Sequence, residues 1–86
     1  MAEYRILIKP SAVKEIEDIP LKKDRQRIIN RIRSLSASPR PPQCEKLSGQ
    51  DKYRLRQGRY RIIYSINDQH SVVNVVKIGH RKDIYR

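Results

Sequence analysis

The last stretch of the chain gathers three side chains that together could cleave a phosphodiester bond. His80, Arg81 and Tyr85 bring an imidazole, a guanidinium group and a phenol to the end of the last predicted strand. Cleavage without a metal needs a group that takes the proton from the ribose 2′-OH, a cation beside the developing phosphorane charge, and a proton source for the leaving 5′ oxygen. Taken singly, Tyr85 also fits a packed terminal ring, and His80 fits a hydrogen-bonded residue at a strand end.

A basic segment precedes this cluster. Six Lys or Arg side chains and a single acid, Asp51, lie between residues 46 and 61. Side chains alternate along strands, so burial of the apolar residues at 53, 55, 60, 62 and 64 would turn Arg54, Arg56 and Arg61 to one open sheet face. An ordinary solvated face is the simplest explanation. Like charges on adjacent strands repel, however, and arginine suits bidentate recognition of phosphate, so we favour an RNA or DNA backbone as the ligand.

The whole chain carries a large positive charge. Its 86 residues include 20 Lys and Arg against 9 Asp and Glu, which gives a formal net charge of +11. Residues 46–86 hold ten of these cations and three of the acids, so this half is the more basic. Such a charge opposes compaction and favours an acidic partner: nucleic acid, an anionic membrane surface or an acidic protein.

Length and composition exclude several classes of protein. The chain suits one domain over residues 1–86 and is too short for a two-domain enzyme. No apolar segment approaches the roughly 20 residues that span a bilayer, and the N-terminus lacks a signal peptide's apolar stretch, so we expect a soluble, cytoplasmic protein with no membrane role. The single cysteine, Cys44, argues against a disulfide scaffold or a zinc site, and no carboxylate cluster suggests a metal.

The elements that must position these residues follow from hydrophobic periodicity. We expect a first strand over residues 4–8, a helix capped by Ser11 and broken by Pro20, and a second helix from Leu21 whose buried stripe is Leu21, Ile28, Ile29, Ile32 and Leu35. Residues 36–50 contain three prolines and form a long connection. Strands over residues 53–56, 60–66 and 72–78 complete the chain, and Gly79 ends the last one. The expected fold is α+β with the order βααβββ: an antiparallel sheet with the helical hairpin packed on one face.

Four sequence stretches together resemble the RelE branch of the RelE/ParE toxin superfamily. These are Leu-Ser-Gly at 47–49, Tyr-Arg-Leu-Arg at 53–56, Tyr-Arg-Ile-Ile-Tyr at 60–64, and Gly-His-Arg at 79–81 followed by Tyr85. The similarity extends over nearly the whole chain, although the two helices contribute only their pattern. It implies a fold like that of small microbial ribonucleases.

The resemblance also implies an activity: a toxin that enters the ribosomal A site and cuts mRNA there, without a metal or organic cofactor. By position, Arg61 matches the arginine that steadies the scissile phosphate, Arg81 the arginine placed as proton donor or transition-state cation, and Tyr85 the tyrosine that orients or deprotonates the 2′-OH. Arginines replace the family's frequent lysines at 54 and 56, and because arginine stays protonated, neither is suited to act as a base. Tyr85 or His80 is therefore expected to act as the general base, and the choice between them stays open. Residues expected to bind RNA and the ribosome are Lys52, Arg54, Arg56 and Arg59.

The expected partners are a cognate antitoxin, the ribosome and mRNA, with operator DNA bound only through the antitoxin complex. The antitoxin should be an acidic, partly helical chain that covers the Arg54 and Arg61 face or displaces the Tyr85 tail. Two alternatives remain: a gyrase-inhibiting toxin like the ParE branch, and a non-catalytic RNA-binding or corepressor module. The Arg61, Arg81 and Tyr85 set speaks against the first, because that branch generally lacks it.

Overall fold

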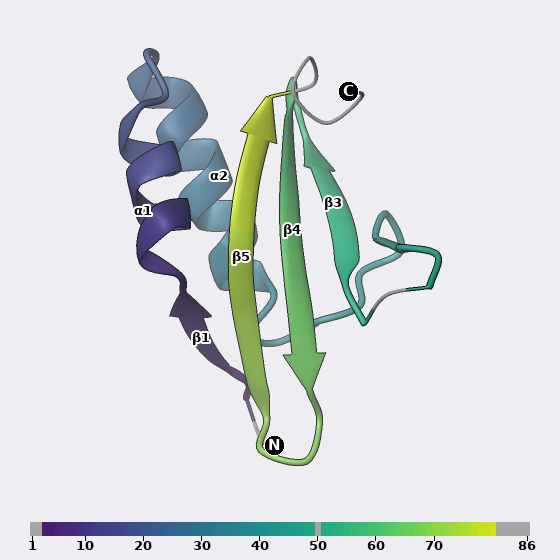
Figure 1. The fold of residues 1–86 in the computed structure, drawn as a ribbon. Helices are drawn as coiled ribbons and strands as arrows, with labels where there is room; N and C mark the ends of the chain where they lie inside the picture. Colours follow the sequence, from purple (N-terminus) through teal and green to yellow (C-terminus); the bar gives the residue numbers. More distant parts are fainter. Residues whose placement is uncertain (1–2, 50, 81–86) are drawn as a thin grey trace.

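The computed structural model describes residues 3–49 and 51–80, so Arg81 and Tyr85 lie outside the described residues. The elements follow one another as β1 (Arg5–Ile8), α1 (Pro10–Glu17), α2 (Lys22–Ser34), β2 (Glu45–Lys46), β3 (Tyr53–Gln57), β4 (Tyr60–Asn67) and β5 (Val72–His80) (Figure 1). None of the described helices is long and apolar enough to cross a membrane.

The strands form one sheet in the order β1-β5-β4-β3-β2. The antiparallel meander of β3, β4 and β5 is confirmed, and β1 joins the same sheet as predicted. Two details of the prediction are wrong. The sheet is mixed, because β1 runs parallel to β5. It also has an additional strand, β2, which lies within the predicted connection and pairs with β3. The fold class is α+β.

Both helices cover the same face of the sheet (Figure 1). Their apolar sides and the inward residues of β3, β4 and β5 form one hydrophobic core, in which the most deeply buried large side chains are Ile28, Ile32, Leu35, Leu55, Ile62, Tyr64, Val73 and Val75. Burying apolar surface is the main favourable term in folding, so this core fixes which side of each strand faces the helices. Neither of the described helices covers the other face of the sheet, which we call the open face.

Local predictions for the helices and the last strand need correction. Ser11 does not cap α1, because the helix already begins at Pro10, whose fixed φ suits the first helical position. Leu21 precedes α2 and is 63% exposed, and Ile29 is 37% exposed, so neither belongs to the buried stripe. Gly79 does not end β5, which runs on to His80 through pairing with β4.

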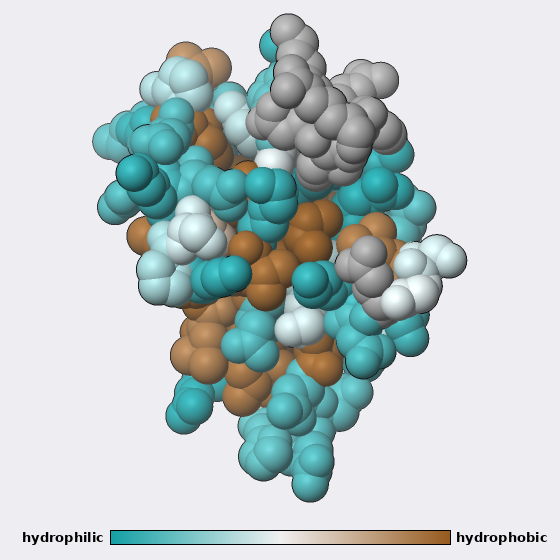
Figure 2. Space-filling model, in the orientation of Figure 1, coloured by the Kyte–Doolittle hydropathy of each residue, from teal (hydrophilic) through white to brown (hydrophobic). Residues whose placement is uncertain are grey.

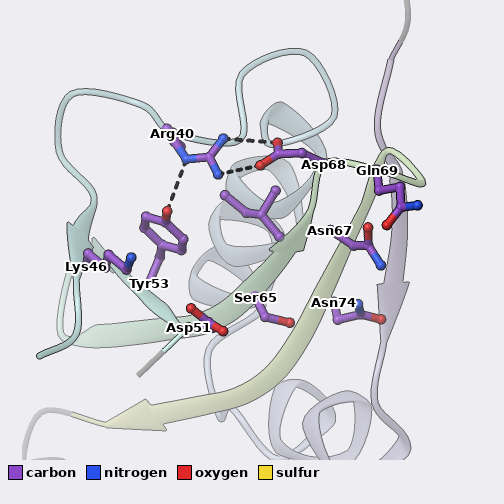
Figure 3. A pocket seen from close by; sticks show the side chains of 10 residues that line it. Arg40, Lys46, Asp51, Tyr53, Ser65, Asn67, Asp68, Gln69 and Asn74 are labelled. Atoms are coloured by element: carbon purple, nitrogen blue, oxygen red, sulfur yellow. Dashed lines mark hydrogen bonds and ion pairs between the residues drawn. The ribbon is translucent and has the colours of Figure 1, made fainter. Parts of the chain in front are cut away.

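The connection after α2 is held against the sheet by polar contacts at its proline-rich part. The hydroxyl of the buried Tyr64 donates to the carbonyl oxygen of Pro39 over 2.8 Å. Arg40 Nε donates to the Tyr53 hydroxyl over 3.1 Å (Figure 3). The two terminal nitrogens of Arg40 donate to the two carboxylate oxygens of Asp68 over 3.2 and 2.8 Å. The Tyr4 hydroxyl donates to the same carboxylate over 2.6 Å. One carboxylate in the β4–β5 turn therefore ties the connection and the start of the chain to the sheet.

This carboxylate should make stability depend on acid pH. Hydrogen bonds from Arg40 and then from Tyr4 lower the pKa of Asp68 from 3.8 to about 2. Because the folded pKa lies below the unfolded one, the stabilisation is complete above about pH 4 and is lost as the pH falls towards 2. Thermal unfolding of the native protein should show this loss between these two pH values, and Asp68→Asn should remove that part of the pH dependence. An identical acid profile for the variant would contradict the assignment.

Candidate nucleic-acid interface

Three arginines share the open face of the sheet. In the β3–β4 register Arg56 lies opposite Arg61, and Arg54 lies opposite Ile63. Their chain neighbours Leu55 and Ile62 pair with each other and are fully buried on the helix side. Alternation therefore turns the three guanidinium groups away from the helices, as the sequence predicts.

The three arginines differ in burial. Arg56 is exposed and Arg54 is half-buried, whereas Arg61 is only 3% exposed, a degree of burial that strand alternation does not indicate. Arginine remains protonated in proteins, so Arg61 is a buried cation. Its partner position on β5 is Gly79, which adds no side chain. The face thus offers one buried cation beside two more accessible ones.

A carboxylate that the sequence did not reveal lies on the same face. Glu45 of β2 pairs with Arg54, and its carboxylate lies 3.4 Å from a terminal nitrogen of that arginine. The Glu45 side chain is 57% exposed, so the ion pair is weak and open to competition by an anionic ligand. Only the pairing of β2 with β3 brings the two residues together, and this pairing has no periodic signal in the sequence.

The open face is not uniformly polar. Figure 2, seen from this side, shows hydrophobic surface between hydrophilic side chains in the middle of the sheet. Half-buried Ile63, which pairs with Arg54, lies on this face. Such a surface can support both phosphate contacts and contacts with the flat faces of bases.

Lys52 and Arg59 lie at opposite ends of β3, and both are exposed. Lys52 immediately precedes the strand, and its carbonyl oxygen accepts a hydrogen bond from Leu47 N over 2.8 Å. Arg59 sits in the two-residue turn to β4, where Gly58 has a φ of 60°, as the first residue of a type II′ turn requires. The candidate RNA-binding cations thus extend along the full length of β3.

His80 lies on the other side of the sheet from Arg61. It pairs with Tyr60, and the two rings meet edge to face with their centres 5.3 Å apart. Both line a cleft of about 300 Å³ together with Glu15, Asp18, Ile19, Pro20 and Ile78, on the side that the helices cover. The described structure therefore does not bring His80 and Arg61 onto one face.

The opposite end of the sheet holds a polar pocket of about 580 Å³ (Figure 3). Its charged side chains are two cations, Arg40 and Lys46, and two acids, Asp51 and Asp68, and most of the others are polar. The charges balance, unlike those of the arginine face. Within residues 3–49 and 51–80, no three His, Cys, Asp or Glu side chains are grouped so that they could hold a metal ion.

Comparison with known proteins places these features in context. The model of the family described as "ParE toxin of type II toxin-antitoxin system, parDE" matches residues 6–85. The chain is also similar to Toxin RelG of Mycobacterium tuberculosis (strain ATCC 25618 / H37Rv), with 44% identity over 34 residues. That match covers 40% of this chain and spans only 39% of the length of the relative.

Solved structures share the fold over most of the chain. The archaeal RelE-RelB complex from Pyrococcus horikoshii OT3 matches with a TM-score of 0.79 and 30% identity, covering 92% of this chain and 96% of that one. The isolated E. coli RelE toxin matches with a TM-score of 0.77 and 26% identity, covering 95% and 90%. The RelBE2 toxin-antitoxin complex from Mycobacterium tuberculosis, at 22% identity and a TM-score of 0.80 over 92% and 99%, supports the fold alone.

Fold, basic face and family match together define a toxin of a type II toxin–antitoxin system. More narrowly, the chain belongs to the ParE toxin family. The RelE/ParE superfamily that the sequence predicts is confirmed, although the sequence resembles its RelE branch and the matching family model is described as ParE.

The open face predicts a salt-sensitive interaction with RNA. Replacing Arg54 and Arg56 by Ala should weaken binding of a single-stranded RNA oligonucleotide. The slope of log affinity against log salt should fall by about 0.7 for each phosphate that the variant no longer binds. The matched control is the double replacement of Lys23 and Arg27, two exposed cations of α2, by Ala. Equal effects of the two double variants in a fluorescence-anisotropy titration would show that net charge, and not this face, governs binding.

Proposed function

We propose that the protein is a ribosome-dependent endonuclease that cleaves mRNA in the ribosomal A site and so inhibits translation, with no metal or organic cofactor. The observation that carries this proposal is the buried cation Arg61, on an open face that it shares with Arg54 and Arg56. A buried guanidinium group has little freedom to reorganise and acts in a medium of low dielectric constant, where it stabilises phosphorane charge strongly. The RelE names of the similar proteins support the same activity.

The proposed chemistry divides between β4 and the residues that follow β5. Arg61 holds the scissile phosphate, Arg81 acts as the transition-state cation or as the proton donor to the leaving 5′ oxygen, and Tyr85 orients or deprotonates the 2′-OH. Arg81 directly follows β5 in the chain, and Tyr85 comes four residues later. The placement of His80 on the helix side, against Tyr60, favours Tyr85 as the base.

In this proposal the cations along β3 bind the ribosome. Lys52, Arg54, Arg56 and Arg59 would hold the backbone of ribosomal RNA and mRNA, since arginine and lysine contacts to phosphate fix the register of a protein on nucleic acid without reading sequence. The ion pair between Glu45 and Arg54 would open as phosphate replaces the carboxylate. Because ribosomes lie in the cytoplasm, the proposed location of the protein is the cytoplasm.

A gyrase-inhibiting activity is the second candidate, because the matching family model is described as ParE. The two activities separate cleanly in cells. Induction of a ribosome-dependent endonuclease should produce new mRNA 5′ ends on ribosomes, whereas gyrase poisoning should raise DNA breaks and leave translation intact.

The proposed antitoxin covers two surfaces of different character. The first is the basic open face, which suits an acidic chain. The second is an apolar groove of about 470 Å³ between β1, α1 and α2, which Val13 and Ile29 line as partly exposed side chains. Exposed apolar residues gathered in a groove are typical of helix-binding surfaces. The RelE-RelB complex of Pyrococcus horikoshii and the E. coli RelBE toxin-antitoxin complex, at 30% and 29% identity, support this occupant. Operator DNA would be bound only through the antitoxin.

The proposed role of Arg61 predicts a loss of cleavage when its charge is removed. Arg61→Gln should lower the rate of mRNA cleavage on programmed ribosomes by about 10²- to 10³-fold, the usual loss when one preorganised stabiliser of an oxyanion is removed. Arg27→Gln, at an exposed position of α2, is the matched control and should cleave at the parental rate. Arg61→Lys keeps the charge, so it tests whether the planar fork is needed if Arg61→Gln does not fold. Parental cleavage by a folded Arg61→Gln variant would exclude Arg61 from the site.

The proposed role of the apolar groove predicts that a charge placed in it weakens antitoxin binding. Ile29→Asp should weaken binding of the cognate antitoxin at least about tenfold, because it puts a charge into a surface that the partner must desolvate. Leu21→Asp makes the same change at a more exposed position outside the groove and should bind normally. Isothermal titration calorimetry measures both. If Ile29→Asp instead dissociates a dimer of the toxin alone, the groove binds a second copy and the assignment to the antitoxin is wrong.

A further inference from the structure

The last part of β5 extends beyond its neighbour β1. The parallel pairing ends with Ile8 opposite Val75, and Lys9 N adds one more hydrogen bond to the Val75 carbonyl oxygen, over 2.9 Å. Strand β5 continues to His80. On the β1 side, its backbone groups after Val75 therefore have no strand of the described chain beside them. Buried backbone donors need partners, so another element must supply them.

Glu15 of α1 supplies one of these partners. Its Oε1 accepts a hydrogen bond from the backbone N–H of Ile78 over 2.9 Å, and its Oε2 lies 3.1 Å from Lys77 Nζ. The Ile78 residue is 4% exposed, so its amide is bonded to a carboxylate away from most solvent. A hydrogen bond to an ionised acceptor is about twice as strong as a neutral one. The Lys77 side chain is half exposed, so the ion pair contributes less than the backbone bond.

The anchor acts immediately after an irregularity in the sheet. In the β4–β5 register Ile63 pairs with Lys77, but its neighbour Tyr64 pairs with Val75, which leaves Val76 as an extra residue on β5. Such a bulge disrupts the ladder locally and bends the strand. Glu15 holds the two residues that follow it, and so fixes the direction in which β5 resumes.

What β5 carries after the anchor is the proposed site. Gly79 lies opposite Arg61 and His80 lies opposite Tyr60, and the chain then leads to Arg81 and Tyr85. A displacement of about 1 Å between reacting groups can lower a rate by 10²-fold. The position of the strand end relative to Arg61 therefore matters for the reaction.

We propose that Glu15 is a positioning residue for mRNA cleavage: its carboxylate on the Ile78 amide holds the end of β5 in register with Arg61. This inference rests on the proposed function. It gives α1 a role in the reaction although the helix lies on the side of the sheet away from the arginine face.

The test separates position from binding and from folding. Glu15→Ala removes the acceptor and should lower the single-turnover cleavage rate on saturating ribosomes at least about tenfold, while ribosome affinity and the circular dichroism spectrum stay unchanged. Glu15→Gln keeps an oxygen acceptor for the Ile78 amide, and Lys77→Met removes only the ion pair, so both should cleave within about twofold of the parental rate. If Glu15→Ala does not fold, Glu15→Asp replaces it, because the shorter side chain withdraws the carboxylate from the amide.

Amide hydrogen exchange on the toxin alone gives an independent readout. The Ile78 amide should exchange faster in Glu15→Ala than in the parental protein, while the Val73 amide, within the part of β5 that β1 covers, should not change. Cleavage by Glu15→Ala at the parental rate, or by Glu15→Gln as slowly as by Glu15→Ala, overturns the positioning role and leaves the proposed function intact. No cleavage by the parental protein overturns the proposed function and the positioning role together.

Discussion

The structure depends on the pairing between β4 and β5. Every other part of the sheet attaches to one of these two strands: β3 and then β2 join at β4, and β1 joins at β5. Both helices bury their apolar sides against residues of the same meander. The register of this pair also assigns every side chain to a face, because a slip of one residue would exchange Ile62 for Arg61 in the core. The hydrophobic core and the cationic face are thus two results of one constraint.

The positive charge of this small protein opposes its folding. The formal net charge of the chain is +11, and like charges repel one another in the compact state. The described acids pair with cations at three places: Asp68 beside Arg40, Glu45 beside Arg54, and Glu15 beside Lys77. Each of these ion pairs joins different elements, so they serve the fold more than the local charge. A ligand or partner that neutralises the remaining cations stabilises the folded chain by mass action as well as by contact.

Much of the fold could be predicted because strand alternation and helical periodicity are local signals. The meander, the buried and open sides of its strands, and the helix pair all follow from them. The interactions that the sequence did not reveal are long-range. Strand β2 has only two residues and exists through pairing with β3, and the parallel direction of β1 depends on a strand far along the chain. The contact from Glu15 to Ile78 joins residues 63 positions apart, and no pattern around Glu15 indicates it. The burial of Arg61 belongs to the same class, because alternation gives a side chain's face but not what covers it.

The parallel pairing of β1 with β5 has a consequence for the order of folding. The first strand has no place in the sheet until residues 72–75 have been synthesised, so the sheet cannot grow strand by strand from the N-terminus. Contacts between such distant segments slow folding, because the whole intervening loop must close first. Helix α1 depends on the same step, since its core contacts and its Glu15 anchor are made with β5. The nascent chain therefore remains without its final architecture through most of its synthesis, and the site that we propose is assembled in one late event.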